Sequence, residues 1–131
     1  ALSSAASDVY KRQTFQLPVA VDVEDNKLKP IPAKELSALV AGAAKQIEDW
    51  GLYAMVYTYT SYANTELDMD ALKAFDLWIA DYRGKRPTRK HGIWQYTSEG
   101  TIPGITGNVD LNHAYKNYPA IIQRAGLSVI R

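Results

Sequence analysis

An apolar run at residues 17–24 (LPVAVDVE) constrains the fold of this chain more than any other stretch. The run begins at a proline and ends with Asp22 and Glu24, a pattern that predicts a buried β-strand with two acidic side chains at its carboxyl end. Side chains two residues apart on a strand point the same way, and each residue advances about 3.3 Å. We therefore expect the two carboxyl groups on one face, roughly 6–7 Å apart.

This separation suits two carboxyl groups that act together on a glycosidic bond. About 5–5.5 Å suits an acid and a nucleophile, whereas about 6.5–9.5 Å leaves room for an attacking water. A second interpretation is structural, because acidic residues at the end of a strand also cap the next helix or stay solvated. Both interpretations are open from these residues alone.

The composition narrows the classes of function. With 131 residues, 47% apolar and 22% charged, the chain is typical of one soluble globular domain. Fifteen basic and fourteen acidic residues nearly cancel, so no nucleic-acid surface is expected. No apolar run approaches the ~18 residues of a membrane span, so no membrane partner is expected. The nine tyrosines and three tryptophans suit a sugar-binding cleft, although they also suit half-buried packing.

We expect no metal and no cofactor. The chain has no cysteine, which excludes disulfides and thiolate sites, and it has only two histidines. It also lacks a glycine-rich phosphate loop of the kind that binds nucleotides or flavins. His91 and His113 are predicted to be surface or hydrogen-bonded residues. The basic segment 83–91 has two interpretations, a solvated loop or a contact with an anionic polymer such as a cell wall.

The periodicity of the remaining sequence predicts strands that alternate with helices. Apolar residues at steps of three and four predict an amphipathic helix over residues 33–50, which Gly51 ends. The alternation in the first half implies parallel strands joined by right-handed crossovers. Further elements are expected as strands at 53–59, 77–82, 92–97 and 108–111, a short helix at 68–75, and a terminal helix at 119–125 closed by Gly126.

Residues 1–13 differ from the rest of the chain. Residues 3–13 are small and polar without periodicity, and they resemble the translation of a transposase-type sequencing adapter. We therefore interpret residues 1–13 as a non-native leader and exclude them from the fold. The alternative is a natural helical segment that leads into the first strand.

Four blocks of sequence follow one another in a distinctive order. They are residues 17–24, residues 56–58 (VYT), residues 77–82 (LWIADY), and a last block that joins IWQYTS at 93–98 to VDLN at 109–112. In order and spacing these blocks resemble the Chalaropsis-type lysozymes of glycoside hydrolase family 25. The resemblance covers residue 14 to about residue 118.

The resemblance implies an α/β fold in which this chain supplies the last five strands of a (β/α)5β3 barrel, that is, a partial TIM-like barrel. Residues 14–131 would then be the C-terminal portion of a glycoside hydrolase catalytic domain. The implied activity is that of a muramidase, which hydrolyses the β-1,4 bond between N-acetylmuramic acid and N-acetylglucosamine in peptidoglycan. The implied place of action is extracellular or at the cell wall, and the implied full-length protein is a monomer.

The resemblance also assigns roles to residues. It makes Glu24 the general acid, with Asp22 and Asp110 as the other catalytic carboxylates. Carboxylates that converge at the mouth of a barrel repel one another, so one of them is expected to keep its proton near neutral pH. The group that attacks the anomeric carbon has three alternatives: an enzyme carboxylate, the N-acetyl group of the substrate, or a water. The implied substrate-binding residues are Tyr57, Trp78, Trp94, Gln95 and Tyr96, and for Trp78 and Trp94 packing within the barrel is the alternative.

The chain departs from the family pattern at its start. The family opens with further strands and another active-site aspartate, and neither is found before residue 14. A complete barrel takes at least ~200 residues, so we expect the 131-residue chain alone to be inactive, poorly soluble, or both. Three other functions compete with a muramidase: a non-catalytic cell-wall glycan-binding module, a barrel hydrolase of chitin-like glycans, and a degenerate remnant.

Overall fold

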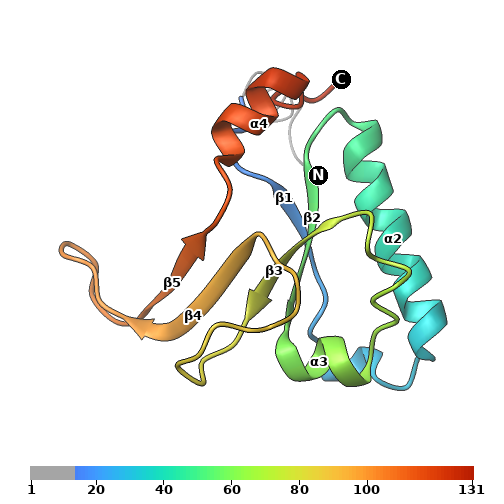
Figure 1. Ribbon diagram of the computed structural model, residues 1–131, viewed down its shortest axis with the longest axis horizontal. Helices are drawn as coiled ribbons and strands as arrows, with labels where there is room; N and C mark the ends of the chain where they lie inside the picture. Colours follow the sequence, from blue (N-terminus) through green and yellow to red (C-terminus); the bar gives the residue numbers. More distant parts are fainter. Residues whose placement is uncertain (1–13) are drawn as a thin grey trace, which may run out of the picture.

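The computed structural model describes residues 14–131, so the predicted leader at residues 1–13 lies outside the described residues. The centre of the described part is a five-stranded sheet in the order β1-β2-β3-β4-β5 that curls into half of a barrel (Figure 1). The first four strands are parallel, and β5 is antiparallel to β4. The predicted α/β fold with a partial barrel is therefore confirmed. The strands are β1 (Val19–Asp22), β2 (Ala54–Tyr59), β3 (Asp76–Ala80), β4 (Ile93–Gly100) and β5 (Val109–Ala114).

The long helix α2 (Ala33–Asp49) covers the outer face of β1 and β2. Its apolar side chains recur every three or four residues, and Leu36 and Val40 pack with Val23 and Val56 in one buried cluster. The helix ends where the sequence predicts, because Gly51 follows it with a φ of +83°, a conformation that residues with a Cβ rarely adopt.

The predicted helix at residues 68–75 is wrong. This segment forms a series of turns in which the N–H groups of Ala71, Leu72, Lys73 and Phe75 bond the carbonyls three residues back. The Asp68 N–H donates to Ser37 Oγ (2.8 Å) on α2. Leu72 is buried against the core, so the segment follows the surface of α2 instead of building its own helix. The short helix of this region is α3 (Thr60–Thr65), which follows β2 directly. A 3-10 turn, η1 (Asn26–Leu28), follows β1.

The terminal helix α4 (Tyr118–Ala125) packs against the amino ends of the strands. Its Tyr118 and Ile122 are buried with Met55 and Ile93. The Asp76 carboxylate accepts hydrogen bonds from Tyr118 Oη (2.7 Å) and Lys116 Nζ (2.7 Å). Burial alone would raise the pKa of Asp76, but these bonds outweigh it and lower that pKa. An ionised aspartate therefore ties α4 to β3.

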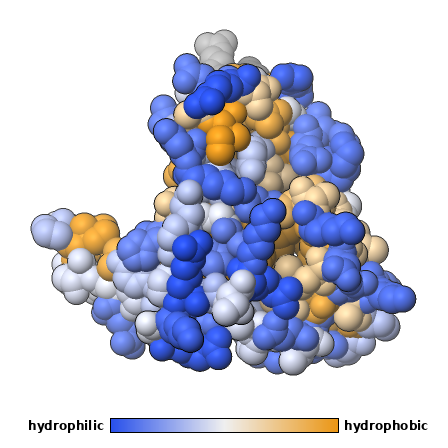
Figure 2. Space-filling view, viewed as in Figure 1, coloured by the Kyte–Doolittle hydropathy of each residue, from blue (hydrophilic) through white to orange (hydrophobic). Residues whose placement is uncertain are grey.

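The β4–β5 hairpin projects from the body of the molecule (Figure 1). Ile102 and Ile105, at its tip, are exposed, and Figure 2 shows the resulting apolar patch. None of the described helices is both long and apolar enough to cross a membrane.

The strands present two different faces because their side chains alternate. Val56, Leu77 and Ile79 lie in the cluster beneath the helices. Asp22 pairs with Tyr57, and Tyr57 pairs with Trp78. Each of the last two is next to a residue of that buried cluster, so their side chains point to the opposite face of the sheet. Polar and aromatic side chains therefore share the inner face of the half-barrel.

The carboxyl end of β1 is held by β2. Val23 is buried, its N–H donates to the Tyr57 carbonyl (3.0 Å), and its own carbonyl accepts a hydrogen bond from the Thr58 hydroxyl (2.7 Å). Thr58 is itself fully buried. These bonds fix the residue that stands between Asp22 and Glu24.

We expect Thr58→Val to lower the free energy of unfolding by about 1–3 kcal/mol, because valine fills the same space but leaves the buried Val23 carbonyl without its donor. Urea unfolding measures the change. Thr101→Val is the matched control, since Thr101 is exposed in the β4–β5 hairpin. Equal urea midpoints for the two variants would contradict this role of Thr58.

Candidate active site

Two carboxylates meet at the carboxyl end of β1. Asp22 is the last residue of the strand, Glu24 follows two positions later, and both line an open pocket of about 470 Å³. Val23, between them, turns the other way into the core. The alternation predicted from the sequence thus places both acidic side chains in one pocket.

The pKa of Glu24 is raised above its ordinary value. Partial burial is the main cause, and the negative charges of Asp22 and Asp110 add to it. Both effects disfavour the ionised form, so Glu24 keeps its proton to a higher pH than an isolated glutamate. Asp110 lies on β5 and is one of the two like charges that act on Glu24. A carboxyl group whose pKa is raised can act as a general acid.

An aromatic wall lies next to the carboxylates. Tyr57, on β2, is paired in the sheet with Asp22 on one side and with Trp78 on the other. The rings of Tyr57 and Trp78 meet edge to face, with centroids 5.1 Å apart. The indole Nε1 of Trp78 donates to Asn112 Oδ1 (2.7 Å) on β5, so β5 also helps to hold this wall.

Gln95 joins two tyrosines of this face. Its side-chain oxygen accepts hydrogen bonds from Tyr57 Oη (2.9 Å) and Tyr82 Oη (2.5 Å). Burial raises the pKa of Tyr57, and the negative charge of Glu24 raises it further. Tyr57 and Gln95 therefore belong to the same cluster as the carboxylates.

Sequence reasoning missed Tyr82 and Asn112. Tyr82 follows Trp78 by four residues and Asn112 follows Asp110 by two, so the period of a strand places each on the side of a residue that was predicted. This periodicity was the signal that could have found them. Tyr82 lies two residues beyond the end of β3, outside the regular strand.

Trp94 and Tyr96 lie outside this cluster, and their role in substrate binding stays a prediction. Trp94 pairs with Ile79, whose side chain is fully buried under the helices, so Trp94 lies on the face opposite Gln95. Its ring packs against Tyr96 and His113. For Trp94 the reason is alternation, because its neighbour Gln95 points to the other side of the strand. Tyr96 lies where the register between β4 and β5 shifts, and its ring stacks on His113.

Asp81 is a structural carboxylate. It is buried, and it accepts hydrogen bonds from the Arg83 guanidinium (2.9 and 2.5 Å) and from Thr60 Oγ1 (2.7 Å). The bonds from Arg83 hold the pKa of Asp81 well below its usual range. Its backbone carbonyl accepts the indole N–H of Trp94 (2.8 Å).

Much of the basic segment 83–91 is engaged within the protein. Arg86 lies over the ring of Tyr115, 3.6 Å from its centroid, and its Nε donates to His91 Nε2 (3.2 Å). Arg89 donates to Asn64 Oδ1 (2.7 Å). The predicted hydrogen-bonded role of His91 is confirmed.

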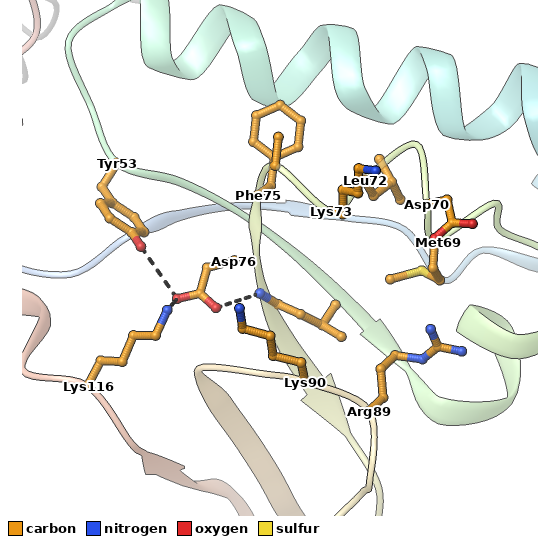
Figure 3. A pocket seen from close by; sticks show the side chains of 12 residues that line it. Tyr53, Met69, Asp70, Leu72, Lys73, Phe75, Asp76, Arg89, Lys90 and Lys116 are labelled. Carbon is orange, nitrogen blue, oxygen red and sulfur yellow. Dashed lines mark hydrogen bonds and ion pairs between the residues drawn. The ribbon is translucent and has the colours of Figure 1, made fainter.

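A wider pocket, of about 740 Å³, lies away from the carboxylates, by the amino end of β3 (Figure 3). Its wall includes Tyr53, Lys90 and the Asp76–Lys116 ion pair. Since Asp76 already accepts bonds from Lys116 and Tyr118, this carboxylate holds the fold together and is not poised to transfer a proton.

Comparison with known proteins places this geometry in a family. Residues 4–105 match the family model of Glycosyl hydrolases family 25. The matched range begins inside the predicted leader, which lies outside the described residues, so the adapter interpretation stays a prediction. A curated relative, the uncharacterized protein YegX of Escherichia coli O157:H7, is 29% identical over 99 residues, which are 72% of this chain and 35% of that protein. The chain thus spans about a third of the length of the curated relatives it matches.

Solved structures share the fold. The catalytic domain of endolysin ply40, from bacteriophage P40 of Listeria monocytogenes, is 29% identical with a TM-score of 0.59, over 79% of this chain and 52% of that one. The spore cortex lytic enzyme SleM of Clostridium perfringens is 25% identical with a TM-score of 0.68, over 78% and 38%. A lysozyme of Streptomyces coelicolor, 20% identical, shows the same fold with a TM-score of 0.70 over 83% and 56%.

We expect Asp22→Asn to lower the pKa of Glu24 toward its ordinary value, because it removes the like charge with the larger effect while preserving the shape of the side chain. Carbon-detected NMR titration of the Glu24 carboxyl measures the change. Glu35→Asn is the control, since Glu35 lies on the exposed side of α2. A Glu24 midpoint that does not move in Asp22→Asn would refute the electrostatic coupling.

Proposed function

Because it matches the family model over residues 4–105, the chain belongs to glycosyl hydrolases family 25, and we propose that its reaction is the hydrolysis of peptidoglycan. The proposed bond is the β-1,4 linkage between N-acetylmuramic acid and N-acetylglucosamine. The observation that carries the proposal is the raised pKa of Glu24 beside Asp22 and Asp110. Relatives described as an endolysin and as a spore cortex lytic enzyme support a lytic function.

Each carboxylate has a distinct task in this mechanism. Protonated Glu24 donates its proton to the leaving glycosidic oxygen. Ionised Asp22 or Asp110 then stabilises the positive charge that develops on the sugar ring. The group that attacks the anomeric carbon is one of three: an enzyme carboxylate, the N-acetyl oxygen of the substrate, or a water.

The inner face supplies the binding groups. Tyr57 and Trp78 meet edge to face beside the acids, and Trp78 is only half-buried, so its ring is available for stacking on a sugar. We place the site of action at the cell wall or outside the cell, and we take residues 14–131 as the C-terminal portion of a catalytic domain that acts as a monomer when full length.

The half-barrel limits catalysis by this chain alone. Within residues 14–131, β1 pairs only with β2, and β5 pairs only with β4. The cleft is therefore open on the side between these two edge strands, and water and substrate are held less firmly there. We expect the 131-residue chain to turn over peptidoglycan far more slowly than a closed barrel does, so its products are sought after a long digestion.

The test separates binding from turnover. Purified peptidoglycan is incubated with the wild-type chain and with Glu24→Gln, and new reducing ends are identified by mass spectrometry after a long digestion. We expect N-acetylmuramic acid ends from the wild type only, with at least a hundredfold loss in Glu24→Gln, because general acid catalysis contributes about 10²–10⁴-fold. Binding to peptidoglycan in a pelleting assay should be the same for both.

Glu99→Gln controls for loss of a negative charge, since Glu99 is an exposed glutamate of β4. N-Acetylglucosamine ends, or equal yields from Glu24→Gln and the wild type, would contradict the proposal. Cleavage of chitin in place of peptidoglycan would favour the alternative function, a barrel hydrolase of chitin-like glycans. Binding without any turnover would favour a cell-wall glycan-binding module.

A further inference from the structure

We propose that Gln95 is a positioning residue that fixes the hydroxyl groups of Tyr57 and Tyr82 as hydrogen-bond acceptors, and that Tyr82 thereby binds a donor group of the glycan. The donor is a hydroxyl or an acetamide N–H of a sugar ring. This inference deepens the proposed function and rests on it.

The geometry assigns the protons. Each tyrosine hydroxyl has one hydrogen, and both hydroxyls donate to the same oxygen, Gln95 Oε1, at 2.9 Å from Tyr57 and 2.5 Å from Tyr82. A carbonyl oxygen has two lone pairs, so the two tyrosines saturate it. Once their protons are committed, the two phenol oxygens have only lone pairs to offer to a ligand. A ligand group that meets them must therefore be a donor.

Gln95 is placed to impose this orientation. Its side chain is only 3% exposed, so water does not compete for its oxygen. Its position in β4, paired with Ala80 of β3 and Asn112 of β5, keeps its side chain on the inner face with Trp78 and Asn112. A buried acceptor of fixed orientation is a more reliable anchor for two hydroxyls than solvent is.

Hydrogen bonds fix the residues before and after Tyr82, while the side chain of Tyr82 is exposed to a ligand. The preceding residue, Asp81, donates its N–H to the Gln95 carbonyl (3.0 Å), and its own carbonyl accepts the indole N–H of Trp94 (2.8 Å). The following residue, Arg83, is bonded to the Asp81 carboxylate. The Tyr82 side chain is nevertheless 51% exposed. A fixed backbone with an exposed ring is what a preorganised binding residue requires.

The two phenol oxygens lie in the field of the candidate acids. Burial raises the pKa of Tyr57, and the charge of Glu24 raises it further. Burial and the charge of Asp110 raise the pKa of Tyr82, although hydrogen bonds with Ser98 and Tyr57 partly offset this rise. Neutral donor groups are favoured next to these carboxylates and lone pairs, whereas anionic groups are repelled. A sugar donor bound here would lie beside the general acid.

The test measures the affinity of the 131-residue chain for a β-1,4-linked tetrasaccharide of alternating N-acetylglucosamine and N-acetylmuramic acid, by NMR titration. Tyr82→Phe deletes only the hydroxyl and should weaken binding about three- to tenfold, the effect of one lost hydrogen bond. Gln95→Met should weaken it at least as much, because both hydroxyls lose their anchor. Gln95→Glu keeps a double acceptor and should restore affinity to within about twofold of the wild type.

A double variant distinguishes positioning from a general structural effect. If Gln95 acts through the Tyr82 hydroxyl, Tyr82→Phe combined with Gln95→Met weakens binding by less than the product of the two single effects. Tyr115→Phe is the matched control, because it also deletes a hydroxyl from an exposed tyrosine, one whose ring packs on Arg86 and His91. It should leave affinity unchanged.

The outcomes separate this inference from the proposed function. Wild-type affinity in Tyr82→Phe, with binding by the wild type itself, would overturn the role of Tyr82 and leave the muramidase proposal standing. No binding by the wild type and no muramic acid ends would overturn both. Far-UV circular dichroism checks the fold of Gln95→Met, and Tyr82→Phe decides the question if that variant unfolds, since Tyr82 is exposed.

Discussion

The candidate site depends on one buried residue, Val23, at the carboxyl end of β1. Its side chain is held in the core beneath α2, and its backbone is bonded on both sides by β2, through the Tyr57 carbonyl and the Thr58 hydroxyl. Because side chains alternate along extended backbone, a Val23 side chain on the outer face, beneath α2, places Asp22 and Glu24 on the opposite side, in one pocket. Hydrophobic burial of an aliphatic side chain is therefore the force that places two like charges together.

The direction of the strands explains how distant residues reach this pocket. Parallel pairing brings the carboxyl ends of β1, β2 and β3 to one edge of the sheet. The final strand is antiparallel, so its amino-terminal half returns to that same edge and carries Asp110 with it. A parallel β5 would have started at the opposite end and carried Asp110 away from Glu24. The antiparallel hairpin thus brings Asp110 to the end of the sheet that carries the candidate site.

The sequence predicted an element correctly where one hydrophobic period dominates. It was misleading where tertiary contacts compete with the local pattern. The strand at residues 17–24 and the helix at 33–50 have clear periods, and both were found. The helix predicted at 68–75 failed because Leu72 is recruited by the core and Ser37 binds the backbone of Asp68, tertiary contacts that local pattern does not encode. Trp94 was grouped with Gln95 by motif, although its pairing with Ile79 puts it on the other face, and Tyr96 lies where the register between β4 and β5 shifts.

Three carboxyl groups of this chain show that the neighbouring groups, and not the residue type, set the direction of the pKa shift. Asp76 and Asp81 are more buried than Glu24, yet their pKa values are lowered, because lysine, arginine or hydroxyl donors bind their oxygens. In the part of the chain that the structure describes, no hydrogen bond to the Glu24 carboxylate is found, and its charged neighbours are acidic. Since its folded-state pKa is raised, the native state loses stability as pH rises through that pKa. Folding places Glu24 where its ionised form is unfavourable, and the same unfavourable environment keeps a proton available for transfer.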